Sequence, residues 1–121
     1  MKKPDLTKVP TPDLLREFVE IAIQQSYAEA KGEQKKLNRL IFLMSDVVAE
    51  LKARGSRDRL AQLFDHAVPW VRMQAARYAY NAIPEQARPV LEALRARKLQ
   101  PEALHAGMTL AAHDKGWAVK D

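Results

Sequence analysis

The sequence of 121 residues contains no cysteine. This absence excludes a disulfide scaffold, a thiolate zinc site, an iron–sulfur cluster and a cysteine nucleophile. Glycine is scarce, with four residues, and Val, Ile and Thr together number 15 against 19 Ala and 14 Leu. Alanine and leucine favour helices, whereas β-branched residues favour strands. Hairpin dipeptides and sustained apolar–polar alternation are also lacking, so we expect an all-α fold.

The sequence also lacks the apolar stretch of roughly 18 residues that a membrane-spanning helix needs. Met1-Lys2-Lys3 is followed by Pro4 and Asp5, where an export signal would continue with an apolar segment. We therefore expect a cytoplasmic protein that does not bind membranes. The length suits one domain over residues 1–121.

Basic charge is concentrated toward the C-terminus. Residues 1–50 carry eight basic and eight acidic side chains, whereas residues 51–121 carry twelve basic and seven acidic ones, which gives the net charge of +5. Such an excess attracts nucleic acid or acidic proteins, but it carries no specificity by itself.

Proline and glycine divide the chain into segments with helical apolar spacing. After an extended lead-in over residues 1–11, Thr11 is placed to cap a helix over 12–31 that Gly32 ends. A second helix presents an apolar face from Leu37 to Leu51 and stops at Gly55. The two-residue link between these helices predicts an antiparallel hairpin.

Shorter helices are predicted in the second half. Ser56 is placed to cap a third helix, and Pro69 opens a fourth whose inner face holds small side chains. We expect a fifth helix over 84–98 and a short segment over 101–106. Gly107 should then separate this segment from a C-terminal tail over 107–121, in which Trp117 and Val119 either fold back or form an apolar edge that favours dimerisation.

One stretch of the second half has the order Leu60-x-x-Leu63-Phe64-Asp65-x-x-x-x-x-Val71-Arg72-x-x-Ala75-Ala76. The paired alanines would let two helices approach closely, and the aspartate would brace the turn. The stretch resembles a HEAT repeat. This resemblance implies a structural role for Asp65 and Arg72, which bond across the turn in that family.

A larger part of the chain, about residues 13–116, resembles a group of short HEAT-like bacterial proteins classed only as a domain of unknown function. The similarity is carried by this repeat, by Asn38-Arg39-Leu40, by Glu50-Leu51-x-x-Arg54-Gly55 and by Ala106-Gly107-Met108-Thr109-Leu110. It implies an α-α superhelix of about three antiparallel helix pairs, and it implies no activity.

Candidate groups for catalysis are few. His66, His105 and His113 lack the spacing of a helical metal pair. No phosphate-binding loop or nucleophile motif is present. Glu17 and Glu20 most simply belong to a solvated helix face. We therefore expect no catalytic residue, no metal and no cofactor, and a protein that is not an enzyme.

Two functional hypotheses follow. The first is a non-enzymatic protein–protein interaction module, of the immunity or adaptor type, whose concave surface exposes Arg39, Arg72, Arg77 and Tyr80. The alternative is a nucleic-acid-binding protein that uses a basic face. The residues of that candidate basic patch are Arg54, Arg57, Arg88, Arg95 and Arg97. Either hypothesis is compatible with a monomer or a homodimer.

Overall fold

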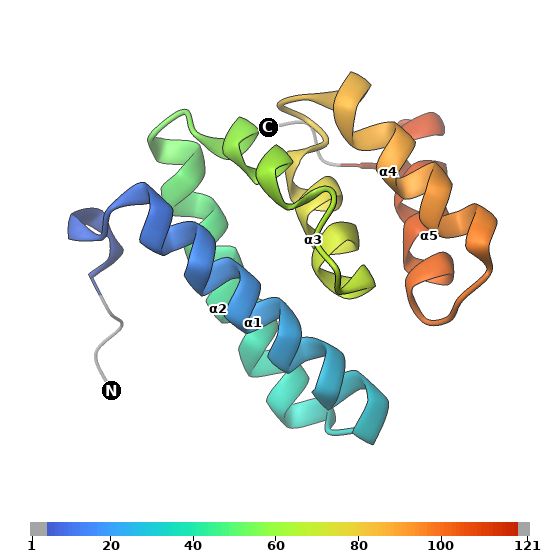
Figure 1. The fold of residues 1–121 in the computed structure, drawn as a ribbon, viewed down its shortest axis with the longest axis horizontal. Helices are drawn as coiled ribbons and strands as arrows, with labels where there is room; N and C mark the ends of the chain where they lie inside the picture. The colour runs from blue at the N-terminus through green and yellow to red at the C-terminus, as the bar shows by residue number, and fades with distance from the viewer. Residues whose placement is uncertain (1–4, 119–121) are drawn as a thin grey trace. The chain divides into compact units, whose positions relative to one another are not determined.

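The computed structural model describes residues 5–118, and within that range the protein is all-helical, without any strand (Figure 1). The all-α prediction is therefore confirmed. The described residues form two compact units that divide after Arg57. The single domain expected over 1–121 stays a prediction. The elements, in chain order, are η1 (Leu6–Lys8), α1 (Thr11–Lys31), α2 (Gln34–Ala53), η2 (Arg57–Leu63), α3 (Pro69–Ala79), α4 (Pro84–Arg97) and α5 (Glu102–Asp114).

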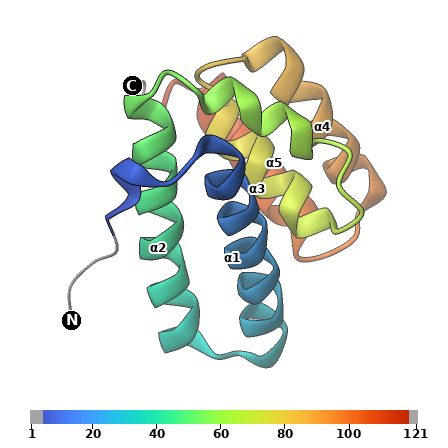
Figure 2. The same ribbon diagram turned by 60° about the vertical axis from the view of Figure 1, so that its left-hand side comes forward.

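The first unit is built on a hairpin of two long helices, α1 and α2 (Figure 2). Gly32 ends α1 with a left-handed φ of 68°, and its N–H donates to the carbonyls of Ala28 and Glu29. The buried Gln25 spans the hairpin, because its Nε2 donates to the Leu40 carbonyl at 3.4 Å. The predicted hairpin is confirmed. Its buried apolar side chains include Leu14, Phe18, Ile21, Leu40, Met44, Val47 and Leu51.

The lead-in differs from the expected extended segment. Residues 6–8 form the 3-10 helix η1, and Asp5 caps it by accepting from the Thr7 N–H at 3.0 Å. Helix α1 begins one residue earlier than predicted, with Pro10 in the capping position. Thr11 therefore lies inside the helix, which leaves its hydroxyl available to a distant donor. Residues 1–4 of the predicted lead-in lie outside the described range.

The second unit packs three α-helices together, because α4 contacts both α3 and α5, and α3 also contacts α5. The inner face of α3 carries the small side chains that the sequence predicts, and Val71, Ala75, Ala76 and Ala79 are fully buried. Pro69 and Pro84 stand in the first turn of α3 and of α4. Within residues 5–118, none of the helices is long and apolar enough to cross a membrane.

Two predicted boundaries in the second half are wrong. The segment after Ser56 is the 3-10 helix η2, and the Ser56 hydroxyl donates to the Arg54 carbonyl behind it. Gly107 does not end a helix, because α5 continues through it to Asp114. A buried face of Ala103, Ala106 and Leu110 outweighs the cost of about 1 kcal/mol that glycine brings to a helix.

The described part of the predicted tail beyond α5 is short. The Trp117 ring is 71% exposed, with the Lys115 ammonium 4.7 Å from its centroid. The Trp117 ring therefore does not fold back into an apolar core, which is the first of the two alternatives predicted for the tail. Val119, the other residue of that prediction, lies outside the described residues.

Replacement by alanine should have opposite effects on stability at Gly32 and at Gly107. Gly32→Ala should lower the free energy of unfolding by about 1 kcal/mol, because alanine is disfavoured at a left-handed φ. Gly107→Ala should raise it by up to about 1 kcal/mol, since its Cβ would meet Arg95 Cδ at an ordinary 3.6 Å. Urea denaturation of both variants checks this, and a destabilised Gly107→Ala protein would contradict the helical role of that position.

Candidate functional site

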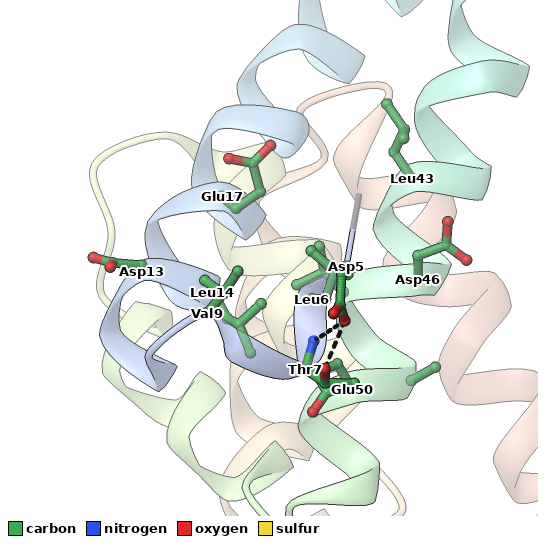
Figure 3. Close-up of a pocket in the computed structure, with 12 residues that line it drawn as sticks. Asp5, Leu6, Thr7, Val9, Asp13, Leu14, Glu17, Leu43, Asp46 and Glu50 are labelled. Atoms are coloured by element: carbon green, nitrogen blue, oxygen red, sulfur yellow. Dashed lines mark hydrogen bonds between the residues drawn. The ribbon is translucent and has the colours of Figure 1, made fainter. Parts of the chain in front are cut away.

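The first unit contains a groove of about 690 Å³ between η1, the first turns of α1 and the last turns of α2 (Figure 3). Its size is typical of ligand-binding pockets. Five of its twelve lining residues are acidic and none is basic. We call it the acidic groove. It is lined by Asp5, Leu6, Thr7, Val9, Asp13, Leu14, Glu17, Leu43, Asp46, Val47, Ala49 and Glu50.

Helical spacing places the acids and the apolar residues of the acidic groove together. On α2, Leu43, Asp46 and Glu50 recur at steps of three and four, so they share one side of the helix. On α1, Asp13 and Glu17 lie one turn apart. Figure 3 shows Glu17 on the α1 wall, opposite Leu43 and Asp46 on the α2 wall. Leu14 and Val47 are almost completely buried, so the apolar surface open to a ligand comes from Leu6, Val9 and Leu43.

Arg54 holds η1, which lines the acidic groove, against the end of α2. Its Nε donates to Glu50 Oε2 at 2.8 Å, and its Nη1 donates to the Thr11 hydroxyl at 3.1 Å. Its Nη2 donates to the carbonyls of Leu6 at 2.9 Å and Thr7 at 3.3 Å. The Arg54 side chain is only 21% exposed. The planar guanidinium thereby joins three separate segments, which a lysine ammonium cannot do in the same geometry.

The acids of the groove differ in how their charge is balanced. Asp13 pairs with Arg16, and Glu50 pairs with Arg54. Hydrogen bonds from the Thr7 hydroxyl and N–H lower the pKa of Asp5 below its ordinary value. Glu17 is exposed and makes no hydrogen bond or ion pair within the described part of the chain. The groove therefore presents unbalanced negative charge over an apolar floor.

A second polar cluster lies in the other unit and joins α4 to α5. The Arg88 guanidinium donates to both carboxylate oxygens of Asp114, at 2.8 and 3.1 Å, and to the Tyr80 hydroxyl at 3.0 Å. The Tyr80 ring stacks on His113 with centroids 3.8 Å apart. The Arg88 bonds hold the pKa of Asp114 below its usual range, and the same bonds raise the pKa of Arg88. Bidentate pairing of this kind fixes geometry between two helices.

The predicted interaction surface is only partly exposed. Arg39 and Arg77 are exposed, but they belong to different units. Tyr80 is 8% exposed, so its predicted exposure is wrong, because its ring packs on His113. Arg72 is half-buried and donates to the His66 carbonyl at 2.6 Å. It thus braces the turn before α3 through the backbone, where the family resemblance implies a bond to Asp65.

The candidate basic patch is also divided between the units. Arg54 and Arg57 belong to the first, and the other three arginines belong to the second. Arg54 and Arg88 are engaged by Glu50 and Asp114, so their charges are balanced locally. Arg95 and Arg97 remain exposed on α4.

Each histidine has a structural contact. His66 Nδ1 accepts from the Val68 N–H at 3.0 Å, His105 packs edge-on against Trp70, and His113 stacks on Tyr80. The described residues contain no group of three or more His, Asp or Glu side chains arranged to hold a metal ion.

Sequence reasoning missed the acidic groove as a site. The sequence predicts that Glu17 belongs to a solvated helix face, and its exposure fits this prediction. The available signal was the interleaving of Leu43, Asp46, Val47 and Glu50 on one side of a helix, but this pattern does not indicate that η1 closes the groove.

Replacing Arg54 by lysine should loosen η1. We expect Arg54→Lys to lower the free energy of unfolding by about 1–3 kcal/mol, because part-buried charge-assisted hydrogen bonds are lost. The exchange of the Val9 amide, which donates to the Leu6 carbonyl at 3.1 Å, should become faster. Arg39→Lys, at an exposed position of the same hairpin, is the control. Unchanged Val9 exchange in Arg54→Lys would contradict the clamp.

Removing the Asp114 carboxylate should alter acid denaturation. Because the folded pKa of Asp114 lies below its ordinary value of 3.8, the pair stabilises the fold above that value and is lost as the pH falls through the lower folded pKa. Asp114→Asn should therefore be less stable at neutral pH and lose less stability on acidification than the parent. Thermal unfolding from neutral to acidic pH measures this, with Asp58→Asn as the control. Parallel pH profiles for Asp114→Asn and the parent would refute it.

Comparison with known proteins gives a family and one similar structure. Residues 12–114 match the model of the Domain of unknown function (DUF2019). The crystal structure of the protein RPA1889 from Rhodopseudomonas palustris CGA009 is 35% identical and superposes with a TM-score of 0.93, over 98% of this chain and 100% of that one. No curated protein matches the chain. The resemblance to a family of unknown function is thus confirmed, and the chain belongs to the DUF2019 family.

Proposed function

We propose that this chain is a non-enzymatic protein-interaction module that binds a partner polypeptide in its acidic groove. The observation that carries the proposal is a groove of about 690 Å³ whose apolar floor and acidic walls come from one helical hairpin and the segment clamped across it. Interfaces are typically organised in this way, with an apolar centre inside a polar rim.

Exposed apolar side chains beside the acidic groove support the proposal. Leu43, on its α2 wall, is 37% exposed, and Ile41 and Phe42, on other sides of the same helix, are 41% and 72% exposed. Three consecutive large apolar residues on a helix surface cost free energy in water unless another surface covers them. Phenylalanine is also among the side chains enriched in the buried centres of interfaces.

The use of the titratable side chains favours binding over catalysis. Packing and turn contacts engage all three histidines, and the bidentate ion pair of Arg88 with Asp114 joins two helices. A general acid or base needs a titratable group beside an open reaction space. The carboxylates of the acidic groove include the exposed Glu17 and Glu50, which is paired with Arg54.

We further propose that the helix hairpins are arranged as in HEAT-like proteins, which use such stacks to bind partners. The antiparallel α1–α2 hairpin and the buried alanines of α3 support this arrangement. A role as an immunity-type or adaptor protein in the cytoplasm belongs to the same proposal. Nucleic acid is a weaker candidate, because phosphate would be repelled by the acidic groove and because Arg54 and Arg88 already face carboxylates.

Site-specific photo-crosslinking tests the proposed function. A photoreactive phenylalanine analogue is placed at Leu43 of the full chain and, as a control, at the exposed Leu104 of the second unit. In extracts of the source organism, Leu43 should crosslink a protein that Leu104 does not. That purified protein should then bind the Leu43→Gln variant about tenfold more weakly than the parent in calorimetry, since interface truncations of this kind exceed about 1 kcal/mol.

The control variant sharpens this experiment. Leu104→Gln should bind the same protein as tightly as the parent does. Identical crosslinks from both positions, or equal affinities of Leu43→Gln and the parent, would overturn the assignment of the acidic groove as the binding site.

A further inference from the structure

We propose that the partner segment bound by the acidic groove is basic and partly apolar, with a lysine or arginine side chain beside Glu17 and apolar side chains on Leu6, Val9 and Leu43. This inference rests on the proposed function, because it identifies the chemistry of what that same groove binds. It rests on the contrast between the negative charge of the groove and the positive net charge of the chain.

The charge of the acidic groove is opposite to that of the protein. Five of the fifteen acidic residues line it, and none of the lysines and arginines within residues 5–118 does. The other ten acidic residues are spread over the remainder of a chain whose net charge is +5. A concave, low-dielectric site lined by one sign of charge concentrates the field there. A basic segment is therefore attracted to this groove and repelled by much of the remaining surface.

The ion pairs that the groove acids already form indicate which carboxylate the basic side chain of the partner would meet. Asp13 and Glu50 already have the arginine partners Arg16 and Arg54. Glu17 stands on the α1 wall with no such partner in the described residues, facing the α2 wall that carries Asp46. A cation from outside can pair with Glu17 without breaking an existing bond. Its pairing with a rim carboxylate contributes mainly to the rate of encounter and to specificity.

The floor of the groove excludes a simple metal ion as its ligand. Divalent cations need several oxygen ligands around one point, and residues 5–118 contain no group of three or more candidate ligands close enough to hold a metal ion. Apolar side chains alternate with the acids instead, among them Leu6, Leu14 and Leu43. Lysine and arginine match such a surface, because their aliphatic stems lie on apolar groups while the charged end reaches an acid.

A polypeptide fits this site better than a free polyamine does. The acidic groove is large enough for several side chains, and its floor offers burial to leucine or valine, which a polyamine lacks. Leu43, which is 37% exposed on the α2 wall, offers further apolar surface to such side chains. A segment in which basic and apolar residues alternate would satisfy the walls and the floor together.

Peptide binding to the full chain tests the inference. The probe is an acetylated, amidated hexapeptide of alternating leucine and lysine, followed by the backbone amide resonances of the labelled protein. Its matched peptides carry glutamine in place of lysine, or alanine in place of leucine. We expect the leucine–lysine peptide to shift resonances of groove residues and to bind at least tenfold more tightly than either matched peptide. Its affinity should fall as salt is added.

Two variants assign the charge effect to the groove. Glu17→Gln should weaken binding of the leucine–lysine peptide about threefold, as expected for a partly exposed ion pair. Glu20→Gln makes the same change in net charge on α1 but lies outside the groove, where it accepts from Gln24, and should leave the affinity unchanged. Equal effects of the two variants would overturn the proposed contact with Glu17.

The remaining outcomes separate this inference from the proposed function. Equal binding of the glutamine and lysine peptides would overturn the basic specificity and leave a groove that binds apolar segments, which the Leu43 crosslinking tests independently. Spermidine that shifts the same resonances with the affinity of the peptide would also overturn the inference, in favour of a polyamine. Failure of the leucine–lysine peptide to bind would overturn it too, and the proposed function would fall only if the Leu43 crosslink were absent as well.

Discussion

The candidate site depends on one side chain, the guanidinium of Arg54. It bonds to Glu50 on α2, to the first turn of α1 and to two carbonyls of η1. Each contact satisfies a different polar group, and together they fix a three-residue 3-10 helix that has no buried residue of its own. Without this clamp, the short segment would have little to hold it beside the hairpin, and the acidic groove would lose one of its walls.

The same kind of interaction has different consequences in the two units. In the first, Arg54 balances one groove acid and leaves Glu17 unbalanced, so net negative charge remains at an open surface. In the second, Arg88 is shared between Asp114 and Tyr80, and the paired charges join two helices. An arginine therefore shapes a binding surface in one case and stabilises packing in the other.

A basic protein with an acidic groove can select its partner by charge at short range. Beyond about one Debye length, which is ~8 Å at physiological salt, the net charge of +5 is largely screened. Within that distance, the carboxylates of the groove dominate the electrostatic interaction with an approaching segment. The apolar floor then contributes most of the free energy of contact, while the acids determine which segment can enter. This division of roles gives a reason for the interleaving of exposed apolar residues and acids on α2.

Proline, glycine and apolar spacing in the sequence determined the all-α class, the α1–α2 hairpin and the buried alanines of α3. These features depend on neighbours within a few residues, where backbone preferences and helical periodicity act. Only the tertiary structure decided that α5 runs through Gly107, that Tyr80 is buried, and that Arg54 reaches Leu6 from 48 positions away. Packing between segments carries α5 through Gly107, buries the Tyr80 ring and closes the acidic groove. No local sequence pattern determines which segments will meet.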